Sequence, residues 1–281
     1  MQGQLGLEGI PAELVRITPA RLNTWAACPR RYRMAYVDRP TPPRAGPHVE
    51  ATVGAAVHNA LKAVSELPAT QRTSEKAVSE LRRCWKHDGF RDRTQSVRHR
   101  DRAAGWLSEY VAGRDGDLSP LAVERWVSAP AGSIIAEGRV DRVDQRGEEI
   151  VVVDYKTGRH VPETDDARTS RALALYAIAA RRTFRKPCRR VELHHVPSST
   201  VASWEHTEDS LAEHLADAGQ TAGRIGRATE AHAAGEDRDV WFPPRTGGHC
   251  SRCDFPAHCP EGTQAAPDLA PWAKVERDDA T

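Results

Sequence analysis

The chain has 281 residues, enough for one large domain or two small ones. Its 40 lysine and arginine residues balance 39 aspartate and glutamate residues, so net charge alone does not indicate a nucleic-acid-binding protein. No apolar run reaches the roughly 18–20 residues that would span a bilayer, and the N-terminus lacks the basic and apolar regions of a signal peptide. We therefore expect a cytoplasmic protein with no membrane contact.

Helices are predicted for most of the first part of the chain. Residues 1–16 have the composition of a flexible leader. Thr18 and Pro19 are typical of a helix start, because threonine caps the first turn and proline fits its first position. Apolar residues then recur at helical spacing. The predicted helices cover residues 18–37 with an interruption at Pro29, 51–67, 74–85 and 97–111.

A β-rich region follows, over residues 121–155. Its last part, Glu149–Tyr155, is apolar and β-branched and predicts a buried strand, and residues 133–143 predict its hairpin partner. This order of helices, then strands, then more helices and strands indicates a mixed α/β layer with a helical N-terminal part. The later predicted elements are a helix over 167–183, strands over 190–197 and 201–206, and a long helix over 210–234.

The predicted hairpin carries charged residues where apolar ones would be expected. Side chains alternate across a strand, so Asp154 and Lys156 face the same way, and Asp141 lies on the neighbouring strand. Two carboxylates can hold a divalent cation, and a lysine beside them can stabilise a phosphate or orient a water molecule. Taken alone, the Asp-x-Lys pattern could also be a surface ion pair, and Asp141 could simply be solvated.

Three cysteines lie close together near the C-terminus, at a spacing that suits thiolates around one metal centre. They are Cys250, Cys253 and Cys259. Cys28, in an N-terminal helical segment, is the natural fourth ligand, although His249 or His258 could serve instead. Spacing alone does not separate zinc from an iron–sulfur cluster. Either centre would tie the N-terminal part to the C-terminal part of the chain.

Two further residues have both a structural and a functional interpretation. His58 lies on an amphipathic helix, where a lone histidine is more often a satisfied core residue, but near the hairpin it could be a third metal ligand. Glu124 begins the β-rich region and could add a carboxylate, although a solvated glutamate is as common.

Four segments together resemble the motifs of one family. Thr18–Tyr32 resembles the cysteine-bearing N-terminal segment of that family. The first, second and third motifs of the family are matched by Gly54-x3-His58, Gly138–Asp144 and Val153–Gly158. In this order they resemble the RecB-like branch of the PD-(D/E)XK nuclease superfamily, which includes Cas4-type nucleases. The resemblance implies an α/β restriction-endonuclease-like core, in which helices flank a mixed central sheet, with a helical N-terminal part and a cysteine-stapled C-terminus.

The resemblance also implies a division of roles. His58, Asp141, Asp154 and the Tyr155 carbonyl would hold Mg²⁺ or Mn²⁺, and Lys156 would complete the catalytic set. The C-terminal cysteine triplet and Cys28 would carry a [4Fe-4S] cluster. Similar proteins have Gln-x3-Tyr on the helix after the hairpin. Here Tyr176 is present, but Ala172 replaces the glutamine and Arg171 stands beside it. Substrate-side candidates are therefore Tyr176, Arg171 and Glu124.

These expectations define a function and a domain organisation. We expect a deoxyribonuclease, most simply an exonuclease, that acts in DNA repair or recombination. The alternative is a non-catalytic DNA-binding or assembly module beside a separate helicase, because the chain has no Gly-x4-Gly-Lys-Ser/Thr loop of its own. The expected organisation is a leader over 1–16, a nuclease domain over 17–260 that includes the cysteine staple, and a polar tail over 261–281.

Overall fold

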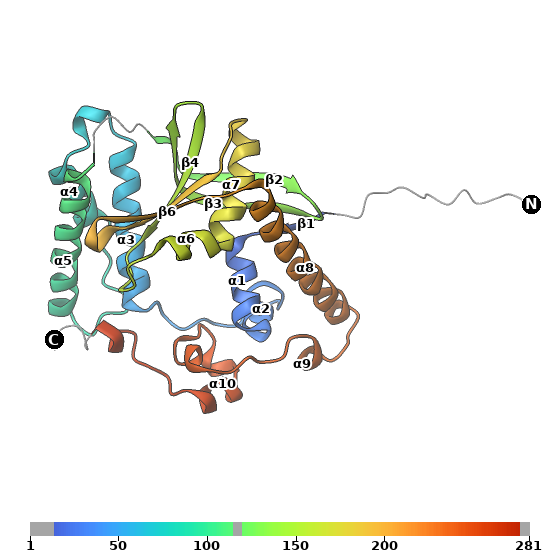
Figure 1. Cartoon of the computed structure of the whole chain (residues 1–281). Helices are drawn as coiled ribbons and strands as arrows, with labels where there is room; N and C mark the ends of the chain where they lie inside the picture. The colour runs from blue at the N-terminus through green and yellow to red at the C-terminus, as the bar shows by residue number, and fades with distance from the viewer. Residues whose placement is uncertain (1–13, 115–119, 276–281) are drawn as a thin grey trace, which may run out of the picture.

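One mixed sheet organises the protein, which is seen here in a computed structural model that describes residues 14–114 and 120–275 (Figure 1). The strand order is β1-β3-β4-β5-β6, and β2 pairs with β3 as well. The β1–β3 and β4–β5 pairs are parallel, whereas the remaining pairs are antiparallel. The strands are β1 Val15–Ile17, β2 Pro120–Ala131, β3 Ile134–Arg146, β4 Glu149–Lys156, β5 Arg190–His195 and β6 Thr200–Glu205.

Helices cover both faces of this sheet, which confirms the expected mixed α/β architecture. They are α1 Pro19–Ala27, α2 Pro29–Tyr36, α3 Val49–Ser65, α4 Ser74–Cys84, α5 Arg93–Ala112, α6 Thr164–Thr169, α7 Arg171–Phe184, α8 Glu208–Ala233, α9 Arg238–Trp241 and α10 Pro260–Ala265. Short 3₁₀ turns are η1 Ala69–Gln71, η2 Val196–Ser198, η3 Gly248–Arg252 and η4 Pro256–His258. Among the described residues, no helix is long and apolar enough to cross a membrane.

Strand β4 shows why the sheet can be covered on both sides. Val151 and Val153 pack into a core formed with α3, α4 and α5, whereas Ile150 and Val152 pack into a second core under α7. Successive side chains of a strand point to opposite faces, so a continuous apolar run buries both of them. Figure 1 shows α3–α5 and α7–α8 on opposite sides of the strands.

The N-terminal helices begin where the sequence predicts. The Thr18 hydroxyl accepts a hydrogen bond from the Arg21 backbone N–H at 3.3 Å, and Pro19 occupies the first turn of α1. Pro29 then starts α2, so Cys28 lies at the junction of the two helices. Cys28 is buried at this junction.

Strands β1 and β4 share one edge of β3, and the sheet forks between them. Strand β2 runs along the other edge of β3 from Ile134 to Asp144. On the shared edge, β1 pairs with residues 134–136 and β4 with residues 142–146. Asp141 therefore lies on β3 between the residues that pair with β1 and those that pair with β4.

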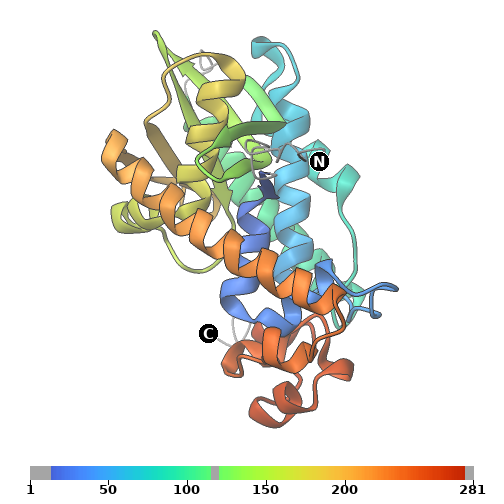
Figure 2. The same cartoon turned by 90° about the vertical axis from the view of Figure 1, so that its right-hand side faces the viewer.

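The segment after Cys259, expected as a polar tail from residue 261, first forms α10. It then runs back to the main body, where the Val49 N–H donates to the Pro271 carbonyl at 3.2 Å and Trp272 and Val275 pack against the α3–α5 core. Figure 2 shows the cysteine-bearing C-terminal region directly below α1 and α2. At the other end, the expected leader lies outside the described residues up to residue 13, and Val15 begins β1.

Candidate active site

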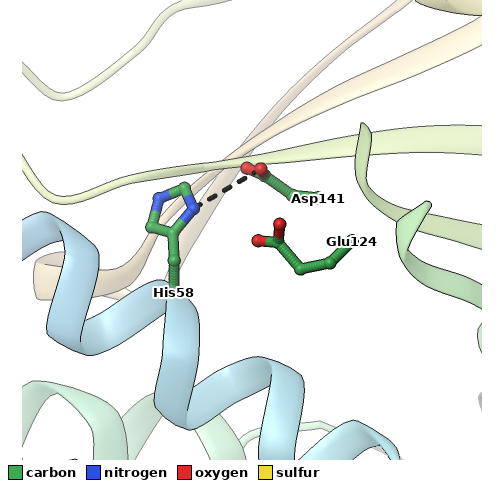
Figure 3. Close-up of side chains that lie close together, drawn as sticks. All are labelled: His58, Glu124 and Asp141. Carbon is green, nitrogen blue, oxygen red and sulfur yellow. Dashed lines mark ion pairs between the residues drawn. The ribbon is translucent and has the colours of Figure 1, made fainter. Parts of the chain in front are cut away.

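A histidine and two carboxylates from three different elements meet at the fork of the sheet (Figure 3). His58 comes from α3, Glu124 from β2 and Asp141 from β3, and their ligand atoms lie within 4.8 Å of one another. His58 Nδ1 is 3.4 Å from Asp141 Oδ1. All three side chains are partly buried. Imidazole and carboxylate donors at this separation suit a divalent cation such as Mg²⁺ or Mn²⁺.

Glu124 reaches this group through an unusual backbone. Its φ of 48° is in the left-handed region, which is uncommon for a residue other than glycine. The register of β2 and β3 places it opposite Asp141, since its two neighbours pair with Arg142 and Val140. Burial raises the pKa of Glu124, Arg139 opposes this shift, and Asp141 adds to it. Two facing carboxylates repel each other, so the arrangement favours a bound cation.

Asp154 and Lys156 form a close pair beside this group. Lys156 Nζ is 2.5 Å from Asp154 Oδ2, and the lysine side chain is 46% exposed, whereas that of Asp154 is 19% exposed. Burial raises the pKa of Asp154, the charge of Lys156 opposes the shift, and the nearby charge of Asp141 adds to it. Asp154 therefore belongs to the same electrostatic environment as Asp141, while Lys156 remains accessible to a substrate.

The backbone of Tyr155 links the two halves of the site. Its N–H donates to Asp141 Oδ2 at 2.9 Å, and its carbonyl oxygen is 3.2 Å from His58 Nε2. Burial lowers the pKa of His58, but hydrogen bonding to Asp141 and the charge of Asp154 outweigh this effect and the net shift is upward. The Tyr155 carbonyl thus lies next to the group formed by His58, Glu124 and Asp141.

Tyr176 of α7 lies over the same region because residue 138 is glycine. A Cβ at Gly138 would come within 2.7 Å of Tyr176 Cε1, so a side chain there would displace the ring. Burial, followed by the charges of Asp154 and Asp141, raises the pKa of Tyr176 to about 12. The phenol is therefore protonated at neutral pH and can donate a hydrogen bond near the carboxylates.

Arg171, the other expected substrate-side residue on α7, has a structural partner. Its guanidinium is 2.8 Å from Asp217 of α8. The adjacent Ala172 lines a pocket with residues of both helices. Arg171 therefore ties α7 to α8, which reduces the charge that it could offer to a phosphate.

The four cysteines of the predicted centre line one pocket between α2 and the C-terminal segment. They are Cys28, Cys250, Cys253 and Cys259. All six cysteines of the chain are free thiols. The Arg245 backbone N–H donates to Cys28 Sγ at 3.4 Å. Within the described part of the chain, no three of these sulfur atoms lie within 4.8 Å of one another. His249 lines the same pocket, whereas Cys84 and Cys188 pack into the two sheet-facing cores.

Residues 16–260 match the PD-(D/E)XK nuclease superfamily, and the chain belongs to this superfamily. Its mixed sheet flanked by helices is the restriction-endonuclease-like fold of that class. Among solved structures, the chain is similar to a proposed exonuclease from Eubacterium rectale, with 10% sequence identity, a TM-score of 0.49, and coverage of 82% of this chain and 88% of that chain. This likeness is too remote to bear on activity. No curated protein matches the chain.

Proposed function

We propose that this protein is a metal-dependent DNA nuclease, most simply an exonuclease that acts in DNA repair or recombination. The observation that carries the proposal is the convergence of His58, Glu124 and Asp141 beside the Asp154–Lys156 pair, in a chain of a nuclease superfamily. The donor set fits Mg²⁺ or Mn²⁺, since facing carboxylates with an imidazole are stable together when a cation lies between them.

The residues would divide the work as follows. His58, Asp141, Asp154 and the Tyr155 carbonyl would hold the cation, and Glu124 supports the set from β2. A bound cation would polarise the phosphodiester and offset the charge of its transition state. Lys156 would donate to a phosphate oxygen or orient the attacking water, because its ammonium lies next to the carboxylates and is accessible. Tyr176, protonated at neutral pH, would donate to the substrate from the α7 side.

The proposal is tested by cleavage of end-labelled single-stranded and duplex DNA. Wild-type protein should cut with Mn²⁺ or Mg²⁺ and should not cut in EDTA. Lys156→Met should retain metal binding but cut about 100-fold more slowly, since removal of one well-placed donor to a developing negative charge has this order of effect.

A matched control is Lys76→Met, which removes an exposed lysine of α4; it should cut as wild type. Cleavage that persists in EDTA, or equal cleavage by Lys156→Met, would contradict the assignment. Binding of DNA ends without cleavage would favour the alternative, a non-catalytic module that works beside a separate helicase.

We further propose that the four-cysteine pocket holds a [4Fe-4S] cluster, with zinc as the alternative. Four thiols that line one pocket would supply the complete ligand set of such a cluster, and equally that of a tetrahedral zinc site. The amide N–H of Arg245 and the guanidinium of Arg30, 3.8 Å from Cys259 Sγ, would stabilise thiolate charge there.

Anaerobically purified protein should therefore be brown, with an absorption band near about 400 nm and with iron and acid-labile sulfide in equal amounts. Cys253→Ser should lose the band, while Cys188→Ser, which changes a buried cysteine of the α7 core, should retain it. Colourless protein that contains one zinc ion per chain would show that the alternative is correct.

A further inference from the structure

Tyr155 lies between the two charged residues of the catalytic strand, and its backbone contacts the site on both sides. The N–H orients Asp141 through the 2.9 Å hydrogen bond to Oδ2, and the carbonyl oxygen meets His58 Nε2 at 3.2 Å. Two expected metal ligands on different elements thus take their orientation from one peptide segment. A small rotation of that segment would move both of them.

By alternation along β4, the side chain of Tyr155 lies on the face opposite Asp154 and Lys156, and it is only 4% exposed. Three rings surround it in edge-on contacts. The Tyr110 ring centroid is 6.0 Å away, that of His58 is 5.7 Å away and that of His194 is 6.3 Å away. Burial raises the pKa of Tyr155, and the charge of Arg142 opposes that shift, so the guanidinium is the polar neighbour of the phenol. The ring is held from several directions.

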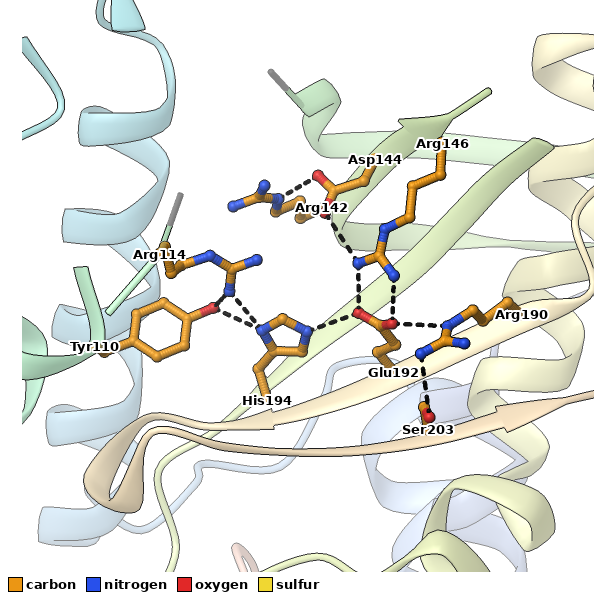
Figure 4. Close-up of polar contacts among 9 residues, drawn as sticks. All are labelled: Tyr110, Arg114, Arg142, Asp144, Arg146, Arg190, Glu192, His194 and Ser203. Carbon is orange, nitrogen blue, oxygen red and sulfur yellow. Dashed lines mark hydrogen bonds and ion pairs between the residues drawn. The ribbon is translucent and has the colours of Figure 1, made fainter. Parts of the chain in front are cut away.

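Behind these rings lies a layer of buried charged residues (Figure 4). His194 is in register with Tyr155 across β4 and β5, and its imidazole contacts the Tyr110 hydroxyl at 2.7 Å and Glu192 at 2.9 Å. Glu192 accepts two hydrogen bonds from Arg146, at 2.7 and 2.8 Å. Charged groups that lose their water shell are stable only when their partners keep a fixed geometry. The layer is therefore a rigid support for the ring of Tyr155.

The protonation states of this layer are consistent with a fixed arrangement. Burial lowers the pKa of His194, with Glu192 opposing, so the imidazole is neutral at pH 7 and can both donate and accept a hydrogen bond. Burial raises the pKa of Glu192, but hydrogen bonds from His194 and Arg146 outweigh this and lower it below its usual range. Glu192 therefore remains ionised, and the layer keeps one hydrogen-bond pattern.

We propose that Tyr155 is a positioning residue for the metal site: its ring, clamped by Tyr110 and His194, fixes the backbone groups that orient Asp141 and His58. This inference rests on the proposed function, because it concerns the same metal site. An apolar residue of smaller size would fill part of the space and continue the strand, but it would leave the peptide held only by the pairing of β4 with β5. Ligand geometry is sensitive to such support, and loss of an orienting partner typically weakens metal binding 10- to 100-fold.

The test measures Mn²⁺ binding to the full chain without DNA, from the electron paramagnetic resonance signal of the free ion. Tyr155→Phe keeps the three ring contacts and should bind Mn²⁺ within about twofold of wild type. Tyr155→Val keeps a strand-forming residue but loses the ring contacts, and should bind about tenfold more weakly. Rescue by phenylalanine separates ring clamping from any role of the hydroxyl.

A control for general destabilisation is Leu81→Ala, which removes a fully buried side chain of α4 in the same core. It should lower the melting temperature and leave the affinity for Mn²⁺ unchanged. Wild-type affinity in Tyr155→Val, or an equal loss in Leu81→Ala, would overturn the inference alone. If wild-type protein does not bind Mn²⁺, or if Asp141→Asn binds Mn²⁺ as well as wild type does, the assignment of the metal site is wrong and both proposals fail.

Discussion

Asp141→Asn should lower DNA cleavage at least 10³-fold while the protein remains folded. Asparagine has nearly the same shape, so it can still accept the N–H of Tyr155, but it removes the charge that faces Glu124 and His58. Metal assistance supplies several kcal/mol of transition-state stabilisation, and each 1.36 kcal/mol corresponds to about tenfold in rate. Initial rates on end-labelled DNA at saturating Mn²⁺, with circular dichroism to confirm folding, would measure the effect.

Glu137→Gln is the matched control for this prediction. Glu137 lies on the same strand and its side chain is 15% exposed, but its partner is Arg16, 3.0 Å away, and not a residue of the site. Loss of that pair should change the cleavage rate less than about twofold, since a partly exposed ion pair contributes little. A folded Asp141→Asn protein with wild-type cleavage would exclude Asp141 from the metal site.

The hairpin that bears Asp141 and Asp154 could be predicted because its signal is local. The apolar β-branched run of β4 and the turn that precedes it determine an antiparallel pair, and the pairing of β3 with β4 confirms that prediction. Alternation along β4 then places Asp154 and Lys156 on one face without any knowledge of distant residues. The same reasoning applies to the start of α1, where Thr18 and Pro19 act within a single turn.

The position of Glu124 could not be predicted in this way. It depends on the register of β2 against β3 and on a left-handed backbone at a residue that is not glycine. Arg171 is a similar case, because its partner Asp217 lies on α8, far along the chain. Pairings of this kind arise only when the helices and strands have packed, so a single sequence shows the charges but not their partners.

The buried charged residues beside β4 show most clearly what a single sequence cannot predict. Arg142 and Asp144 follow Asp141 in a motif of charged residues interspersed with valines, yet their side chains are only 7% and 1% exposed. Alternation places them on the face opposite Asp141, where β5 contributes Glu192 and His194. A sequence pattern cannot distinguish a solvated charge from a buried one, because the difference is set by the helix α5 that covers this face.

Asp144→Ala should destabilise the protein by about 3–5 kcal/mol, since it leaves the buried guanidinium of Arg142 without its closest acidic partner. Arg146, 3.8 Å from the same carboxylate, would lose a second interaction. Urea denaturation followed by circular dichroism would give the change in the free energy of unfolding. Asp165→Ala, which removes the 70% exposed partner of Arg168, should cost less than about 1 kcal/mol.

A double substitution tests whether pairing or mere polarity matters at this position. Because an apolar pair can replace a buried ion pair at little cost, Arg142→Met with Asp144→Leu should be more stable than Asp144→Ala alone. The charge left unpaired, and not the loss of a favourable contact, is then the cause of the destabilisation. A double variant less stable than the single one would show instead that the ionic pair makes a net favourable contribution to the stability of the sheet. The buried charges beneath β4 would then stabilise the fold as well as support the metal site.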